Sequence, residues 1–409
     1  MAQYQASCDS CDPGSVALPF PEDDVIFSLA RTALGMPPAP AAAAVAAPVP
    51  AAAAAALGPA AATTAESAGA ARGLCVLYSC ASSFPGLRLA RVDPAGAGAG
   101  AWRVAATAPS VDPGLLANAG VVASLGSRVY VADDGAGFSM LLEIDASSNS
   151  TRLINVSSPA GQSAQASFFA LAAAAGGDGD HIVALELAIP LNYPPFVLVA
   201  DVFLANASSE ARSANFALDW VDSFDWHKTG VAALDTRRGI FYPVVGRLPT
   251  RHEVLAGVPM TGSSDRRRPL AAVLYGPTDA KSGAPADVTS LLYSAARDEL
   301  LAVTLGTAGG PAAPPAVYAR PAGPSGGPAN ASWTMRFAWP AGLSGELGNA
   351  ALADDGDTVF AWWASAGAGA RPSFFAVSAS SGAQLGALDL PADECENAAD
   401  AHVADVTVC

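Results

Sequence analysis

The segment Val231-Ala-Ala-Leu-Asp-Thr-Arg-Arg-Gly-Ile-Phe-Tyr242 is the clearest sign of the fold class of this chain. It places two apolar runs on either side of a polar turn, and the same shape returns in Ser290–Leu301 and Ala350–Phe360. Short apolar runs separated by Gly, Asp, Asn, Ser and Pro are typical of strands joined by tight turns. Long helical periodicity is nearly absent after Gly73. We therefore expect an all-β domain over residues 73–409.

The start of the second strand recurs at a nearly constant spacing. The anchor residues are separated by steps of 53, 53, 58, 60 and 59, and they are Val76, Val129, Ile182, Ile240, Leu300 and Val359. A third and a fourth strand often follow, as in Leu141–Asp145 and Thr151–Val156. Four antiparallel strands at a fixed period are typical of a β-propeller. We expect six blades, and seven is the alternative because residues 192–226 have room for two more strands.

The two ends of the domain predict how the ring closes. Ala401–Cys409 has the pattern of an inner first strand with no second strand after it, whereas Gly73 begins a second strand with no first. Pairing them would complete one blade from both ends of the domain. It would also bring Cys75 near Cys409 and Cys80 near Cys395. We expect these two nested disulfides, although four cysteines allow three connectivities and four reduced thiols are the alternative.

The repeats resemble those of generic β-propeller proteins across residues 73–409, about four-fifths of the chain. The resemblance is one of architecture, because the Gly-His and Trp-Asp marks of WD40 blades and the glycine pattern of kelch blades are absent. It implies a fold and no catalytic residues, so the catalytic residues stay unknown.

The region before the repeats divides by composition. Residues 1–36 form a tail with one short helix, which we expect to begin near Pro21. Residues 37–72 contain 20 alanines among 36 residues with interspersed prolines, which predicts a disordered, flexible linker. No run of strongly apolar residues is long enough for a transmembrane segment.

Charge and sequence motifs restrict the setting and the partners. The chain carries 21 Lys and Arg against 37 Asp and Glu, a formal charge of −16, which argues against nucleic acid as a partner. Together with the terminal cysteines, four glycosylation sequons favour a secreted or extracellular protein, although no signal peptide is visible. The sequons begin at Asn149, Asn155, Asn206 and Asn330.

The densest group of chemically active side chains lies between residues 219 and 227. Carboxylates, indoles and an imidazole occur together there, at Asp219, Trp220, Asp222, Asp225, Trp226 and His227. Aromatic faces beside carboxylates suit a sugar or an organic cation, so this cluster is the candidate ligand-binding site. The competing interpretation is that the two indoles anchor a long connection between blades.

We expect no cofactor and no metal site, and calcium is the alternative. Asp133-Asp-Gly135, Asp178-Gly-Asp180 and Asp354-Asp-Gly-Asp357 offer too few oxygen ligands for calcium, and tight turns require the same residue types. Cys8 and Cys11 lack the other two ligands that zinc needs.

Two functions fit these patterns. The first is a binding or interaction module with a protein or carbohydrate ligand, of undetermined oligomeric state. The second is a hydrolase or lyase that gathers carboxylates and a histidine at the central channel. A histidine beside two acids at the channel would favour the enzyme, whereas a channel lined by small apolar residues would favour the binding module. The candidate histidines are His181, His227, His252 and His402.

Overall fold

A computed structural model describes the chain from Gly73 to Cys409, apart from short segments between or within strands. Those segments are 81–83, 94–101, 108–118, 134–139, 158–163, 176–179, 191–195, 205–209, 219–225, 228–229, 248–250, 257, 260–266, 269–271, 279–285, 308–314, 323–331, 340–344, 366–370, 392–393 and 396–400. The predicted tail (1–36) and linker (37–72) lie outside the described residues and stay predictions.

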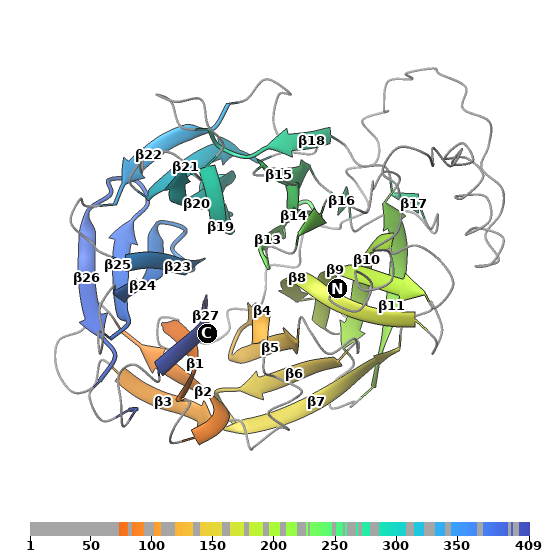
Figure 1. Cartoon of the computed structure of the whole chain (residues 1–409), viewed down its shortest axis with the longest axis horizontal. Coiled ribbons are helices and arrows are strands. Elements are labelled where there is room, and N and C mark those ends of the chain that lie inside the picture. The colour runs from red at the N-terminus through yellow and green to blue at the C-terminus, as the bar shows by residue number, and fades with distance from the viewer. Residues whose placement is uncertain are drawn as a thin grey trace, which may run out of the picture. The chain divides into compact units, whose positions relative to one another are not determined.

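The described strands form a ring of sheets around a central axis, which is the predicted β-propeller (Figure 1). The ring closes through a four-stranded sheet in the order β27 (Ala401–Val408), β1 (Leu74–Cys80), β2 (Phe84–Val92) and β3 (Trp102–Thr107). Strands β27 and β1 run antiparallel, with Leu74 opposite Val408 and Cys80 opposite Ala401. The predicted closure by strands from both ends of the domain is confirmed.

Four further groups of four consecutive antiparallel strands follow the predicted repeat. The first group consists of β4 (Ala119–Leu125), β5 (Arg128–Asp133), β6 (Met140–Asp145) and β7 (Ser150–Ser157). The second group consists of β8 (Ala164–Ala175), β9 (Asp180–Pro190), β10 (Phe196–Leu204) and β11 (Glu210–Leu218). The third group consists of β19 (Ala286–Ser294), β20 (Glu299–Thr307), β21 (Ala316–Pro321) and β22 (Thr334–Ala338). The fourth group consists of β23 (Gly345–Leu352), β24 (Thr358–Ser365), β25 (Ser373–Ser378) and β26 (Gln384–Asp389).

The sheet between β11 and β19 is less regular. Its central strand, β14 (Ile240–Arg247), pairs with four short strands, and Pro243 lies in its middle without an N–H for the ladder. Those partners are β12 (Trp226–His227), β13 (Ala232–Asp235), β15 (Arg251–Ala256) and β16 (Val258–Pro259). Strand β18 (Ala272–Tyr275) extends the sheet from β15, and β17 (Arg267–Arg268) pairs instead with β11.

The hydrogen bonding corrects the predicted number of blades. The sequence predicted six blades, with seven as the alternative, whereas the described strands form five hydrogen-bonded sheets. Parallel pairing of Glu210–Arg212 on β11 with Asn155–Ser157 on β7 merges two four-strand groups into one nine-stranded sheet. Within the described part of residues 192–226, β10 and β11 complete the group that β8 begins, and no extra pair of strands is seen there.

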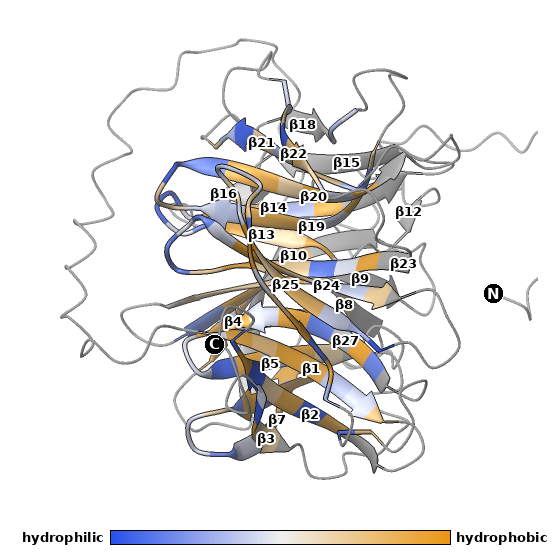
Figure 2. Ribbon diagram, turned by 90° about the vertical axis from the view of Figure 1, so that its left-hand side faces the viewer, coloured by the Kyte–Doolittle hydropathy of each residue, from blue (hydrophilic) through white to orange (hydrophobic). Residues whose placement is uncertain are grey.

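The core lies between neighbouring sheets and explains why the strands have apolar residues on both faces. In β1, Leu74, Val76 and Tyr78 pack toward β24 and β25, whereas Cys75 and Leu77 pack toward β5 and β6. Successive side chains of a strand point to opposite faces, so a strand between two neighbours is a continuous apolar run. Figure 2 shows hydrophobic residues, in orange, along strands such as β1 and β5.

Both predicted disulfides are present in the closing sheet. Cys75 bonds to Cys409 and Cys80 to Cys395, with Cα–Cα distances of 5.7 and 5.6 Å. All four cysteines are buried. The alternative of four reduced thiols is therefore wrong, and the bridges join the two ends of the domain.

Ion pairs join the turn of one four-strand group to the next group around the ring. The Arg238 guanidinium donates to both carboxylate oxygens of Asp298, at 2.6 and 2.5 Å, and to Asp235 at 2.7 Å. Two further pairs repeat this link, and they are Arg297 with Asp357 and Arg128 with Asp180. The hydrogen bonds from Arg238 lower the pKa of Asp298. The repeated arginine and aspartate positions thus fix neighbouring groups against each other.

Candidate functional site

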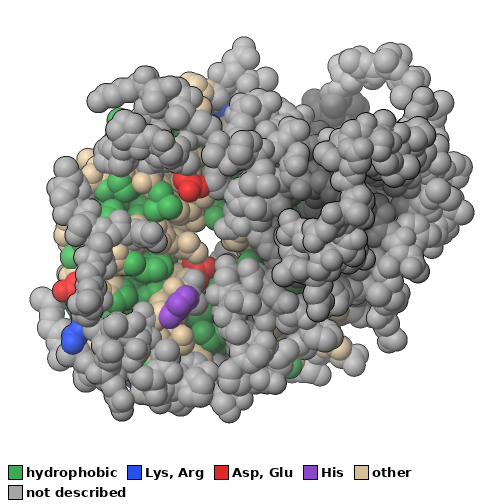
Figure 3. Space-filling view, viewed as in Figure 1, with side chains coloured by type: hydrophobic (Ala, Val, Ile, Leu, Met, Phe, Trp, Pro, Cys, Tyr) green, Lys and Arg blue, Asp and Glu red, His purple; other side chains and the backbone are tan. Residues whose placement is uncertain are grey.

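A cavity of about 280 Å³ opens at the centre of the ring. Within the described part of the chain, six strands line it, namely β4, β8, β13, β19, β23 and β27, and each contacts the next. The space-filling view shows the face hollowed there (Figure 3). Because inner strands from every part of the repeat region meet at this point, the cavity is the candidate functional site.

Asp405 on β27 is the charged group of the cavity wall. Its Oδ1 accepts a hydrogen bond from Nδ2 of Asn349 on β23 (3.0 Å) and another from the backbone N–H of Val406 (2.7 Å). The residue is only 7% exposed. Burial raises the pKa of Asp405 to about 7, and the two hydrogen bonds offset only part of that rise. The carboxyl group can therefore change its charge near neutral pH.

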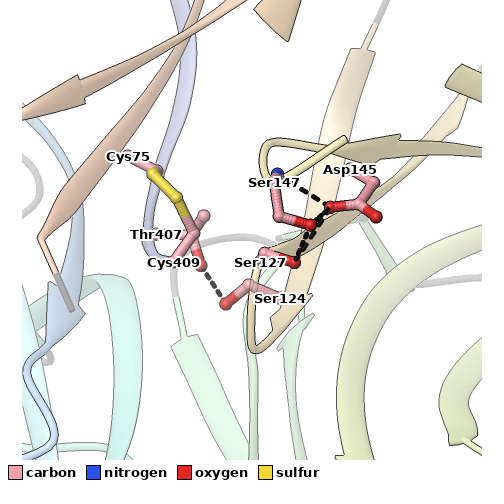
Figure 4. The surroundings of a disulfide bond; sticks show 7 residues. All are labelled: Cys75, Ser124, Ser127, Asp145, Ser147, Thr407 and Cys409. Carbon is pink, nitrogen blue, oxygen red and sulfur yellow. Dashed lines mark hydrogen bonds between the residues drawn. A yellow bond between two sulfur atoms is a disulfide. The ribbon is translucent and has the colours of Figure 1, made fainter. Parts of the chain in front are cut away.

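Other polar side chains continue the same side of the wall. Thr407 on β27 donates its hydroxyl to Ser124 on β4 at 2.5 Å, close to the Cys75–Cys409 disulfide (Figure 4). The buried hydroxyl of Ser290 on β19 accepts the backbone N–H of Ala350 on β23 at 2.6 Å. Each of these bonds links two neighbouring inner strands, so a polar arc runs from β19 through β23 and β27 to β4.

The opposite side of the wall is apolar. Strand β8, strand β13 and the two residues before β13 contribute aliphatic side chains and one glycine, which are Leu171, Ala172, Ala173, Gly230, Val231, Ala232, Ala233 and Leu234. Among the described lining residues there is no Lys, Arg or His, and Asp405 is the only carboxylate. The cavity therefore joins one polar, acidic side to one apolar side.

The predicted ligand-binding cluster is mostly outside the described residues. Asp219, Trp220, Asp222 and Asp225 fall in the segment 219–225. Trp226 and His227 form β12, which pairs with Arg247 and Gly246, and their backbones are described. This cluster stays a prediction.

The predicted gathering of histidines at the channel is not seen in the described part of the chain. His402 is exposed on β27 opposite Ser79, and His181 lies half-buried on the second strand β9. His227 and His252 lie on β12 and β15, which do not line the cavity. The described lining residues are mainly small and apolar.

The acidic turn at Asp354–Asp357 uses its oxygens inside the protein. Asp355 accepts the backbone N–H groups of Asp357 and Thr358, both at 2.8 Å, and Asp357 accepts from Ser378 and Ser380. In the described residues, no three His, Cys, Asp or Glu side chains come together as metal ligands. Asp134, Gly135 and Asp178 lie outside the described residues, and Asp180 pairs with Arg128. The turn chemistry thus accounts for Asp355 and Asp357, while calcium binding stays a prediction.

Two of the four sequons fall on described, exposed positions. Asn149 lies in the turn between β6 and β7 with a positive φ of 51°, and Asn155 lies on β7. Asparagine adopts this left-handed conformation more readily than most residues. Asn206 and Asn330 lie outside the described residues.

Asp405 and Asn349 are site residues that the sequence patterns did not predict. The available signal for Asp405 was a lone acid within Ala401–Cys409, which is predicted as an inner strand. Asn349 had no comparable signal, because its role depends on the neighbouring strand.

No family model matches the sequence, and no curated protein matches it. Among solved structures, the chain is similar to TolB from Acinetobacter baumannii, at 11% identity over 83% of this chain and 66% of that chain, with a TM-score of 0.45. It thus spans slightly less than two thirds of the TolB chain. It is also similar to a nidogen/laminin complex, at 10% identity over 82% of this chain and 98% of that chain, with a TM-score of 0.44. A putative 6-phosphogluconolactonase from Bacteroides uniformis matches at 13% identity over 78% and 84%, with a TM-score of 0.44.

Proposed function

We propose that this chain is an extracytoplasmic binding module that holds a small ligand in its central cavity. The observation that carries the proposal is the cavity wall, which combines an apolar side with a few convergent polar groups around Asp405. Small-molecule sites have this composition, with apolar walls for affinity and a small number of placed polar groups for orientation. A protein or carbohydrate partner at residues 219–227 remains a separate expectation.

The extracytoplasmic setting is supported by the cysteines and by the sequons. Two buried disulfides join the ends of the domain, and disulfides persist in oxidising compartments. Asn149 and Asn155 are exposed acceptors. No helix in the described residues is long and apolar enough to cross a bilayer. The test is secretory expression followed by glycosidase digestion: a mobility shift that Asn149→Gln and Asn155→Gln reduce supports the proposal, and an unglycosylated chain with free thiols contradicts it.

Ligand binding in the cavity is tested with a fragment library. The full chain, with its disulfides intact, is screened by ligand-observed NMR. Ala172→Phe fills the cavity from β8, and Ala387→Phe places the same ring on the exposed strand β26 as the matched control. We expect some fragments to bind the native chain and the control but not the cavity variant. A library with no such fragment would contradict binding in the cavity.

A further inference from the structure

We propose that the central cavity takes a small amphipathic primary amine, with its ammonium group against Asp405 and its apolar part against β8 and β13. This inference rests on the proposed function and names the ligand class for the same cavity. It follows from the charge of the wall, from the Asp405 oxygen Oδ2, which accepts no hydrogen bond from the described residues, and from the division of the wall into two sides.

The carboxyl group of Asp405 has hydrogen-bonding capacity left over. Its two protein bonds, from Asn349 and from the backbone of Val406, both reach Oδ1. No hydrogen bond to Oδ2 is found within the described residues. A buried carboxylate with few partners is costly unless a donor or a cation compensates it. A primary ammonium supplies both a charge and three N–H donors.

The sign of the charge selects against other ligand classes. Because no cationic side chain lines the described wall, a phosphate or carboxylate ligand would meet Asp405 without a counter-charge. The chain as a whole is also acidic, with a formal charge of −16. The lack of a cationic side chain in the described wall and the acidic charge of the chain both favour a cationic ligand over an anionic one in the cavity.

An organic ammonium fits the wall better than a metal ion. Hard cations such as calcium require about six to eight oxygen ligands. Asp405 is the only carboxylate in the described wall, and no cluster of three metal-ligating residues occurs in the described chain. In contrast, the described lining residues of β8 and β13 are aliphatic and carry no charge, so the hydrocarbon part of an amine would meet no charged group there.

The size of the cavity limits the ligand to a small molecule. A volume of about 280 Å³ lies just below the usual range for ligand sites, which begins at about 300 Å³. Each buried methylene group adds about fourfold to affinity. We therefore expect affinity to rise with alkyl chain length until the cavity is full and then to fall.

The test compares three probes with the same alkyl chain. Binding of n-hexylamine, 1-hexanol and hexanoate to the full chain is measured by NMR titration at pH 8, with n-butylamine and n-octylamine for the length dependence. We expect hexylamine to bind about tenfold or more tightly than hexanol, because a charge-assisted hydrogen bond replaces a neutral one. Hexanoate should not bind measurably.

The variant Asp405→Asn removes the charge and keeps the shape. It should reduce hexylamine affinity to the level of hexanol and leave hexanol unchanged. Asp389→Asn is the matched control, because Asp389 is an exposed aspartate on β26 away from the cavity. The control should bind hexylamine as the native chain does.

A variant-free measurement keeps the inference testable if Asp405→Asn fails to fold. Lowering the pH from 8 to 5 protonates Asp405 while hexylamine stays charged, so hexylamine should bind less tightly and hexanol equally well. Among described groups near Asp405, Tyr293 in the wall bonds Asp298, and Tyr78 on β1 bonds Glu394. The variant His402→Gln removes the exposed imidazole on β27 and should retain the pH effect.

Three outcomes would overturn the inference. One is equal affinity of hexylamine and hexanol, and another is a preference for hexylamine that Asp405→Asn leaves intact. The third is displacement of hexylamine by micromolar calcium, which would identify a metal site. In each case, neutral fragments that Ala172→Phe excludes would still support the small-ligand function, whereas loss of all cavity binding would contradict both proposals.

Discussion

The buried carboxyl group of Asp405 should make the stability of the protein depend on pH in a direction opposite to most aspartates. The perturbation is Asp405→Asn, which keeps an acceptor oxygen for Asn349 and removes the ionisable group. Burial raises the folded-state pKa of Asp405 from 3.8 to about 7. Between these two values, the unfolded chain has released the proton while the folded protein still holds it. The free energy of unfolding therefore falls as pH rises through this window, and it is unaffected below it.

The size of the effect follows from the width of that window. A difference of about three pKa values, at about 1.4 kcal/mol each, gives an upper limit of about 4 kcal/mol. At pH 4 the native chain and Asp405→Asn should have similar stability. At pH 8 the variant should be more stable by up to about 4 kcal/mol, because it carries no buried charge.

Urea unfolding of both proteins at several pH values, with the disulfides intact, measures this difference directly. Taking the difference between variant and native chain removes the contributions of other titrating groups, such as Asp145, whose pKa several serine hydrogen bonds lower to about 2 despite the opposing effect of its burial. Asp389→Asn is the control and should show no such trend. A stability difference that does not change between pH 4 and pH 8 would refute the reasoning.

Three further predictions concern stability. Arg238→Ala should cost about 3 kcal/mol, because it leaves the buried carboxylate of Asp235 without its cation, and adding Asp235→Asn should recover part of this loss in chemical denaturation. Equal losses with and without Asp235→Asn would contradict that explanation. Replacing both cysteines of one disulfide by serine should cost only about 3 kcal/mol, because the other bridge still closes a loop of more than 300 residues. Removing that second bridge as well should cost about 6 kcal/mol more, because the long loop is then open. If calorimetry shows that the stability lost on removing both bridges equals the sum of the two separate losses, the nested-loop explanation is wrong. Gly348→Ala should cost about 1–3 kcal/mol, since a Cβ there would overlap the indole of Trp362, and combining it with Trp362→Leu should restore stability. If thermal unfolding shows no rescue, the overlap is not the cause.

The predictability of the site differs between its two sides. The apolar side follows from short inner strands of alanine, valine and leucine, which the sequence pattern places in β8 and β13. The polar side rests on Asp405 and Asn349, which are 56 residues apart and belong to different repeats. Neither residue forms a motif with its neighbours along the chain. Their pairing could not be predicted, because it depends on which residues of two adjacent strands face the axis.

The amino-acid sequence alone determined the all-β class and the four-strand repeat, because both depend on local alternation and on turn residues. It also predicted the closure of the ring, since each end of the domain has a strand without a partner, and that closure favoured one of the three cysteine connectivities, which the structure then decided. Only the tertiary structure decided that β7 and β11 join two groups into one sheet, and that the cavity has an acidic side and an apolar side. Both outcomes depend on contacts between distant strands, whose packing a local pattern does not specify.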